Sequence, residues 1–323
     1  MNGAGVKVAV VGARGVGKHH AKWYALSGCD VVAFVGTSEE SCRATEKTLR
    51  DLFGFQGRGY WDLGEMLTRE QPDIVDVCSP NERHKEHVLR ALDFGAGVMC
   101  EKPLVWDTGK SGEEILADGR EIVDRAGEPG RTLGLCTQYA ASLRPYLEMY
   151  EQARGPMGRI ERVYGEMDSV ARNGGKAYEE IWIDLASHPL SFLLVFLPEG
   201  ELDSDTIECV VEHKENRVRF DYVSRSGRCA VEIVLRNLPK GAAPVRRFGV
   251  NDFLVAWEGR PDDSGVYRAY LKHGDEETCC EDFMHTLLNS FASHIAGTDG
   301  QVLVTGETAL RNLELQVEVL EKR

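Results

Sequence analysis

The stretch KVAVVGARGVGKHHA, Lys7 to Ala21, decides the fold of the first part of the chain. Its Val-rich start predicts a buried strand, and Gly12, Gly15 and Gly17 then turn the chain into a segment with helical character. Glycine allows the positive φ angles of such a turn, and free N–H groups at the start of a helix favour a pyrophosphate. The turn therefore predicts a phosphate cradle. The alternative is an ordinary glycine-rich loop that binds no phosphate, because a strict G-x-G-x-x-G motif from Gly12 would have its second glycine at Arg14.

Composition limits the classes of protein to consider. The chain has 323 residues, enough for two domains, and 38 Lys plus Arg against 52 Asp plus Glu give a net charge of −14. This balance argues against nucleic acid and anionic membranes as partners. The longest apolar run, Leu190 to Leu197, is too short to span a bilayer, and the first residues lack the apolar core of a signal peptide. We expect a cytoplasmic protein.

The nine cysteines are scattered without C-x-x-C pairs. Several lie in apolar runs, so they predict buried thiols in a reducing compartment and neither a disulfide framework nor a metal site. The adjacent Cys279 and Cys280 have no metal-ligand spacing, and we assign them no role.

The second predicted strand, Asp30 to Gly36, bears on cofactor choice. A fold that binds NAD usually ends this strand with a carboxylate for the adenosine ribose, whereas here Thr37 and Ser38 follow Gly36, with Arg43 nearby. Hydroxyl donors and an arginine suit a 2′-phosphate, which favours NADP while leaving NAD possible. In the alternative interpretation Ser38 only caps a helix over 39–52 and Arg43 is solvated on it.

The first half of the chain alternates strands and helices, which predicts a doubly wound parallel sheet. Beyond residue 52 we expect a loop over 53–60, a short helix over 61–69, a strand within 72–84, helices over 85–94 and 113–126, and strands over 98–100 and 132–136. The strand at 98–100 delivers Glu101, Lys102 and Pro103 at its carboxyl end, where ligands bind in open α/β sheets. An exposed loop lysine is the alternative for Lys102.

The second half predicts a different domain. From about residue 139 a run of strand-like segments with partly alternating polarity indicates a predominantly antiparallel sheet, followed by helices over 281–296 and 305–322. We therefore expect a dinucleotide-binding domain over 1–138 and a substrate-binding α+β domain over 139–323. A sheet with one open face is expected to associate into a homodimer or homotetramer.

Ile181 to Pro198, IWIDLASHPLSFLLVFLP, predicts a buried helix in this second domain. Asp184 and His188 are four residues apart and share one side if their turn is helical. Pro189 biases His188 away from helical geometry, so the regular helix is expected to begin near Ser187. By itself the pair is more typical of a local cap or a satisfied pair than of a catalytic dyad.

The glycine turn followed by His20, the SPNERH segment and GAGVMCEKPL, in this order, resemble the Gfo/Idh/MocA family of oxidoreductases. The resemblance implies a Rossmann domain joined to an antiparallel sheet whose outer face commonly mediates oligomers. It places Lys102 near the substrate and the nicotinamide. The turn residues Pro80, Asn81 and His84 are implied to lie along the cofactor. Arg14 and Gly36 depart from the family pattern.

The segment around His188 resembles the family motif D-x-G-x-H-x-x-D, in which the Asp orients the His and the His is the acid/base. Ala186 replaces the glycine and Ser191 the last Asp. Gln138 and Tyr139 resemble residues that line the substrate cleft. Further candidates precede the motif: Arg172, Lys176, Tyr178 and Trp182.

These residues predict an NAD(P)-dependent oxidoreductase that acts on a secondary alcohol of a sugar, cyclitol or related polyol. His188 exchanges the hydroxyl proton, Asp184 holds its tautomer, and Lys102 stabilises the developing alkoxide. Lys102, Asp184 and His188 also contact substrate, with Gln138, Tyr139, Arg172 and Tyr178. The predicted cofactor-binding residues are Gly12, Arg14, Gly15, Val16, Gly17, Thr37, Ser38, Arg43, Ser79, Pro80, Asn81, His84, Glu101 and Lys102.

Two other functions stay open at this point. Some proteins that resemble the family cleave glycosidic bonds through transient oxidation by a tightly bound NAD. Others are cofactor-binding regulators, although an acid/base together with a cation argues for an enzyme.

Overall fold

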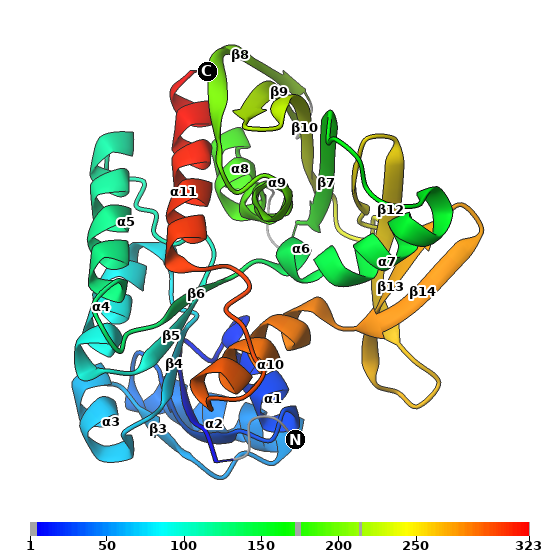
Figure 1. Ribbon diagram of the computed structural model, residues 1–323. Helices are drawn as coiled ribbons and strands as arrows, with labels where there is room; N and C mark the ends of the chain where they lie inside the picture. The colour runs from blue at the N-terminus through cyan, green and yellow to red at the C-terminus, as the bar shows by residue number, and fades with distance from the viewer. Residues whose placement is uncertain (1–4, 172–175, 213–214, 323) are drawn as a thin grey trace. The chain divides into compact units, whose positions relative to one another are not determined.

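The computed structural model describes residues 5–171, 176–212 and 215–322 (Figure 1). Contacts divide the chain into two compact units, Met1–Thr137 with Met284–Leu310, and Gln138–Phe283 with Arg311–Arg323. The first division falls next to the predicted domain boundary. The sequence interpretation did not place 284–310 with the first unit, where Thr305 bridges to Gly134.

The first unit is built on a six-stranded parallel sheet in the order β3-β2-β1-β4-β5-β6, which confirms the doubly wound prediction. Its strands are β1 Lys7–Val11, β2 Asp30–Val35, β3 Arg58–Tyr60, β4 Ile74–Val77, β5 Gly97–Glu101 and β6 Leu133–Cys136. The α-helices of 1–137 are α1 Gly17–Leu26, α2 Glu39–Phe53, α3 Leu63–Glu70, α4 His84–Phe94 and α5 Gly112–Ala126.

The sheet order creates a switch point between β1 and β4, because the chain proceeds outward from β1 in one direction and returns to begin again at β4. Strands β4 and β5 are buried along their whole length, as expected for a parallel sheet covered on both faces. Helix α1 packs against α2, while α3, α4 and α5 pack in succession.

The prediction of a loop over 53–60 was wrong in part, because β3 pairs with the edge of β2. Close packing against β2 requires glycine at two positions in or next to β3, which a sequence pattern does not show. A Cβ on Gly57 would lie 2.2 Å from the Val32 carbonyl oxygen, and one on Gly59 would lie 2.7 Å from the Phe34 ring.

The second unit is built on an eight-stranded sheet in the order β14-β13-β12-β11-β7-β10-β9-β8. Only the central β7–β10 pair is parallel, so the prediction of a predominantly antiparallel sheet is confirmed. The strands are β7 Arg162–Val170, β8 Gly200–Glu212, β9 Glu215–Ser224, β10 Gly227–Leu238, β11 Arg246–Val250, β12 Phe253–Pro261, β13 Tyr267–His273 and β14 Glu276–Glu281.

Two helices and a strand were missed by the sequence interpretation: α6 Gln138–Ala141, α7 Leu143–Arg154 and β14. Helix α7 is held by Tyr146, whose hydroxyl donates to the Phe253 carbonyl oxygen at 2.8 Å and accepts from the Val250 N–H at 2.8 Å. These partners lie more than a hundred residues away in the sequence, so no local pattern predicts the contacts.

The predicted buried helix over 181–198 is two helices, α8 Tyr178–Leu185 and α9 Ser187–Phe196, with Ala186 between them. Helix α9 begins at Ser187, so Pro189 lies in its first turn. The missing N–H of Pro189 costs no hydrogen bond within the helix, because N–H groups in a first turn have no partner there. A Cβ on Gly165 of β7 would lie 2.4 Å from the Pro189 Cβ, so the glycine lets α9 lie directly on the sheet. The closing helices are α10 Phe283–Ile295 and α11 Gly306–Glu321.

Candidate functional site

The glycine turn after β1 is shaped by two close backbone approaches. Gly12 has φ +91, and a Cβ there would lie 2.6 Å from the Cys78 carbonyl oxygen beyond β4. A Cβ on Gly17 would lie 2.7 Å from the Gly12 carbonyl oxygen and 3.0 Å from the Val10 side chain. These positions match the first and third glycines of the dinucleotide fingerprint, which make the tight turn and the close helix–strand packing.

Gly15 and Val16 complete the turn without such constraints. A Cβ on Gly15 would meet no atom within 4 Å. Val16 precedes α1, and no side chain caps the helix there, so the first turn has no side-chain partner that would compete with an anion. Arg14, at the second glycine position of the fingerprint, lines a neighbouring pocket.

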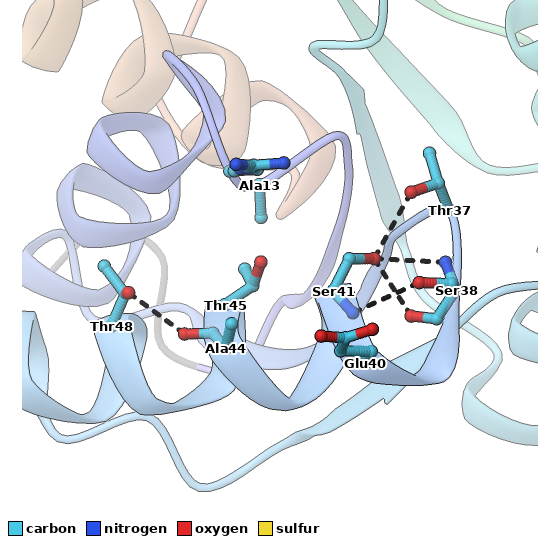
Figure 2. Close-up of a pocket in the computed structure, with 9 residues that line it drawn as sticks. Ala13, Thr37, Ser38, Glu40, Ser41, Ala44, Thr45 and Thr48 are labelled. Carbon is cyan, nitrogen blue, oxygen red and sulfur yellow. Dashed lines mark hydrogen bonds between the residues drawn. The ribbon is translucent and has the colours of Figure 1, made fainter.

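This pocket lies where the glycine turn meets the start of α2 (Figure 2). It encloses about 430 Å³ and is lined by Ala13, Arg14, Thr37, Ser38, Glu40, Ser41, Ala44, Thr45 and Thr48. In this fold the end of β2 receives the adenosine ribose. The pocket brings predicted residues from the first turn and from the end of β2 together.

The hydroxyl groups in the pocket also organise the start of α2. The Ser41 N–H donates to Ser38 Oγ at 3.2 Å, and the Ser38 N–H donates to Ser41 Oγ at 3.0 Å, so Ser38 is the N-cap (Figure 2). Arg43 does not line this pocket. Its side chain is 72% exposed and pairs with Glu39 one turn earlier on α2.

The turn after β4 carries the predicted Ser79, Pro80, Asn81 and His84. The buried His84 ring lies between two carbonyl oxygens, with Nε2 2.8 Å from that of Ser79 and Nδ1 2.9 Å from that of Pro103. Burial lowers the pKa of His84. His84 thus links the turn after β4 to the segment that contains Lys102. This structural role does not depend on contact with a cofactor.

Lys102 follows the last residue of β5, and the Lys102–Pro103 peptide bond is cis. Its position at the carboxyl end of a central strand is the one in which this fold presents groups to a bound nucleotide. Glu101 is nearly buried at the same strand end.

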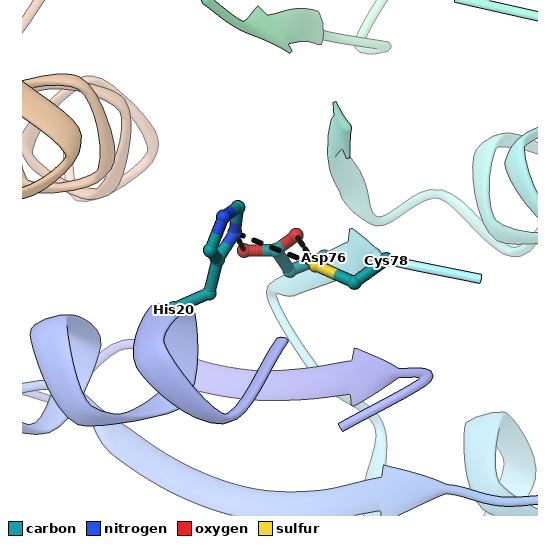
Figure 3. A group of neighbouring side chains, drawn as sticks. All are labelled: His20, Asp76 and Cys78. Atoms are coloured by element: carbon teal, nitrogen blue, oxygen red, sulfur yellow. Dashed lines mark hydrogen bonds and ion pairs between the residues drawn. The ribbon is translucent and has the colours of Figure 1, made fainter. Parts of the chain in front are cut away.

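A buried charged cluster lies beside this strand end and was missed as a site by the sequence interpretation (Figure 3). His20 of α1 is fully buried, with Nδ1 2.9 Å from Asp76 Oδ2 on β4 and Nε2 3.1 Å from Glu101 Oε1 on β5. Cys78 Sγ lies 3.5 Å from Nδ1, and Cys136 Sγ lies 3.8 Å from Nε2. The position of His20 in the family pattern was the available signal.

The charge on His20 explains why two carboxylates can be buried in this cluster. Burial alone lowers the pKa of His20, but the Asp76 carboxylate and its hydrogen bond contribute to a pKa well above the ordinary value. His20 is therefore an imidazolium between two carboxylates. Burial raises the pKa of Cys136 to about 12, so this thiol stays neutral. The residues could also group around a metal ion, but the paired imidazolium already compensates the buried carboxylates.

The second unit holds the other catalytic candidates. His188, on the first turn of α9, is 5% exposed, and its Nδ1 accepts a hydrogen bond from the Gln138 N–H at 3.2 Å. Tyr139 lies beside it, with ring centroids 6.1 Å apart, and donates its hydroxyl proton to the Glu166 carbonyl oxygen at 2.6 Å. The structure thus brings Gln138, Tyr139 and His188 together.

The remaining predicted residues that the structure describes lie on α8 or just before it. The Asp184 carboxylate forms an ion pair with the Lys176 ammonium group. Tyr178 is the first residue of α8 and Trp182 is fully buried, donating from Nε1 to the Gln316 carbonyl oxygen at 3.1 Å. Arg172 lies outside the described residues.

Two amides of α11 hold the first turn of α9 in place. Asn312 Nδ2 donates to the Ser187 carbonyl oxygen at 2.9 Å and to Ser191 Oγ at 3.0 Å, and Gln316 Nε2 donates to Ser187 Oγ at 3.0 Å. Ser191, which replaces the last Asp of the family motif, therefore has a structural partner. Buried hydrogen bonds of this kind fix the backbone that carries His188.

A doubly wound sheet with a glycine turn at its switch point is the arrangement of a dinucleotide-binding Rossmann fold. Residues 6–134 match the GFO_IDH_MocA model, described as an oxidoreductase family with an NAD-binding Rossmann fold. Residues 6–134 are therefore similar to the Gfo/Idh/MocA oxidoreductases.

Two curated proteins are similar to part of this chain. D-glucoside 3-dehydrogenase of Escherichia coli is 31% identical over 50% of this chain and 42% of its own length. Inositol 2-dehydrogenase of Klebsiella pneumoniae is 32% identical over 45% of this chain and 39% of its own length. Each alignment spans less than half of the relative.

Solved structures extend the likeness in fold over nearly the whole chain. Levoglucosan dehydrogenase in complex with NADH and levoglucosan superposes with a TM-score of 0.74 at 14% identity, covering 98% of this chain and 96% of that one. UDP-N-acetylglucosamine 3-dehydrogenase from Acidithiobacillus ferrooxidans gives 0.71 at 16% identity, covering 97% and 96%. Among the described residues, the helices are all too short or too polar to cross a membrane.

Proposed function

We propose that this protein transfers a hydride between a nicotinamide cofactor and a secondary alcohol of a sugar, cyclitol or related polyol. The observation that carries the proposal is the glycine turn at the β1–β4 switch point, where backbone packing requires Gly12 and Gly17 and the start of α1 has no side-chain cap. These features fit a dinucleotide pyrophosphate. The named activities of the relatives support a sugar or cyclitol substrate.

NADP is our proposed cofactor, with NAD as the alternative. Gly12, Gly15, Val16 and Gly17 would surround the pyrophosphate, and Thr37 and Ser38 would face the adenosine ribose. Arg14 lines the same pocket as these two residues, so it is the cation best placed for a 2′-phosphate. When bound, the nicotinamide supplies the site that accepts or donates the hydride.

The hydrogen bond at His188 bears on its chemical role. Because the Gln138 N–H donates to Nδ1, the neutral ring carries its proton on Nε2. In this tautomer Nε2–H can donate to a substrate carbonyl or alkoxide oxygen. For Nε2 to accept the hydroxyl proton as a base, this tautomer must first be exchanged. We therefore propose His188 as the residue that holds the reacting oxygen, with Lys102 as the group that exchanges its proton.

The family resemblance assigns the acid/base role to His188 instead, with Asp184 as its orienting group. The pairing of Asp184 with Lys176 is compatible with a carboxylate that positions substrate or the start of α8. Both assignments predict that Lys102 and His188 act on one substrate oxygen, and they differ in which residue carries the proton.

Turnover measurements on variants test the function. We expect Lys102→Ala and His188→Ala each to lower kcat by about 10²-fold or more while the dissociation constant for NADPH changes little. The double variant should lose less than the product of the single effects, because both groups serve one proton transfer. Near-normal turnover in both single variants, with lowered melting temperatures, would show that the two residues are structural.

A further inference from the structure

Arg246, on β11, faces the same side of the sheet as the catalytic candidate His188. In the register of β11 with β7, Arg246 is opposite Met167 and Phe248 is opposite Gly165. Gly165 contacts Pro189 of α9, so this face of the sheet is covered by α9. Directly opposed residues in neighbouring strands point to the same face, which places Arg246 on the α9 side.

The guanidinium of Arg246 forms no ion pair with a described carboxylate, unlike the other arginines of this sheet. Among the described residues, no ion pair includes Arg246, and its buried Nε has no hydrogen-bond partner. Every other arginine in the described strands of the sheet is ion-paired: Arg162, Arg217, Arg219, Arg228, Arg236, Arg247, Arg260 and Arg268.

Trp257 of β12 forms a surface beneath Arg246. The Arg246 Cζ lies 4.8 Å from the centre of the Trp257 ring, a cation–π contact that orients the planar guanidinium. Trp257 Nε1 is also buried without a hydrogen-bond partner. Two neighbouring donors are therefore left unsatisfied at one place, although buried polar groups normally have partners.

A short series of aromatic rings connects this place to His188. The Tyr139 ring centre lies 6.1 Å from that of His188 and 5.7 Å from that of Trp257. His188 and Trp257, which carries Arg246 over its ring, therefore both lie close to Tyr139. A substrate that reacts at His188 and contacts Arg246 would carry its charged group away from the reacting carbon.

The titratable neighbours do not neutralise Arg246. Burial raises the pKa of Tyr139 and of Tyr267, so both phenols stay uncharged. The buried carboxylates Glu166 and Asp168 alternate with Met167 on β7 and therefore face away, where Arg236 contacts both. Asp282 lies near Tyr267, and no ion pair joins it to Arg246 among the described residues.

We propose that Arg246 and Trp257 form a subsite for an anionic oxygen group of the substrate, either a carboxylate or a phosphate. The inference rests on the proposed function, which it narrows to acidic or phosphorylated sugars and polyols. A planar guanidinium binds either oxyanion through two parallel hydrogen bonds, and a partly buried unpaired charge gains most from such a partner. Trp257 Nε1 supplies a further donor.

Steady-state kinetics with NADP test the subsite through matched sugars. D-glucose, D-gluconate, D-glucuronate and D-glucose 6-phosphate share most of their hydroxyl groups and differ in charge. We expect an acidic or phosphorylated sugar to have the highest kcat/KM, and the two kinds of anion distinguish a carboxylate from a phosphate subsite. Arg246→Met should raise KM for that sugar by about 10- to 100-fold with little change in kcat, and Arg246→Lys should restore part of the loss. Arg247→Met is the matched control, because Arg247 faces the other side of the sheet and pairs with Glu166.

A binding measurement separates failure of the subsite from failure of the dehydrogenase. Inorganic phosphate and the two sugar acids are titrated by calorimetry into the wild type, Arg246→Lys, Arg246→Met and Arg247→Met. Binding that Arg246→Met alone abolishes supports the subsite even if no sugar is oxidised. Oxidation of D-glucose with a KM equal to those of its acidic analogues, unchanged in both Arg246 variants, would overturn the subsite and leave the dehydrogenase intact. Equal anion binding by the wild type and the Arg246 variants would also overturn it.

Discussion

The main-chain N–H of Gln138 donates a hydrogen bond to Nδ1 of His188 at 3.2 Å. Gln138 begins the second unit, directly after the segment that follows β6. The imidazole is thereby oriented from the backbone, which a side-chain substitution at Gln138 does not remove. The tautomer that this bond selects leads to the first prediction.

We expect His188→Gln to retain at least about 10-fold more turnover than His188→Ala, because a glutamine amide can donate from nearly the position of the imidazole Nε2–H. An amide cannot exchange a proton near neutral pH. The pH profile of kcat should therefore keep its shape in His188→Gln if Lys102 exchanges the proton. Equal loss in both variants, with disappearance of one limb of the profile, would instead assign the acid/base role to His188.

Cofactor preference gives the second prediction. Arg14 lines the pocket at the start of α2, whereas Arg43 is exposed and paired with Glu39. We expect Arg14→Ala to weaken NADPH binding by about 10-fold or more and NADH binding much less, since only NADPH has the 2′-phosphate. Fluorescence titration of both cofactors measures this.

Arg43→Ala is the matched control for Arg14→Ala. The sequence interpretation expects Arg43 to contribute to the 2′-phosphate site, and the position of its side chain favours Arg14. Loss of NADPH affinity in Arg43→Ala but not in Arg14→Ala would return the role to Arg43. Tighter binding of NADH than NADPH by the wild type would contradict the cofactor preference itself.

The buried pairing of His20 with Asp76 and Glu101 gives the third prediction. Removing the imidazolium leaves two buried carboxylates without a cation, so His20→Gln should lower the free energy of unfolding by about 3 kcal/mol near pH 6. The pKa of folded His20 is raised, so the stabilisation is complete below the unfolded-state pKa of about 6.5 and is lost as the pH rises through the folded-state pKa. The difference between the variant and wild type should therefore shrink with rising pH.

Urea unfolding over a pH series checks this expectation. Arg144→Ala is a control for an exposed pair, since Arg144 is 90% exposed and contacts Glu148, and it should change stability by less than about 0.5 kcal/mol at any pH. A pH-independent loss in His20→Gln would mean that packing, and not charge, explains the effect.

The outer face of the eight-stranded sheet gives the fourth prediction. Leu254 and Tyr164 line a pocket of about 790 Å³ on this sheet, and Leu254 is 37% exposed. We expect association through this face into a dimer or tetramer. Light scattering should give a mass at least twice 35.9 kDa at micromolar concentration, and Leu254→Arg should reduce it. A wild-type mass near that of one chain would contradict the prediction.

The local pattern of the sequence was enough to predict the first sheet and its glycine turn. Alternating apolar runs and glycine turns act over a few residues, so β1, the turn at Gly12 and the strand that ends at Glu101 could be located without knowing their neighbours. The Ser38 cap and the start of α9 at Ser187 are likewise local, because they depend on hydrogen bonds and a proline within one helical turn.

Only the tertiary structure could decide which side chains meet. The sequence indicates Arg43 as the ligand of a 2′-phosphate, whereas the tertiary structure places Arg14, and not Arg43, at the pocket. The charge on His20 depends on carboxylates supplied by β4 and β5, and the unpaired state of Arg246 depends on the register of β11 with β7. Burial, strand register and long-range hydrogen bonds depend on residues far apart in the chain. They determine the pKa of a buried group and whether a hydrogen-bond donor has a partner.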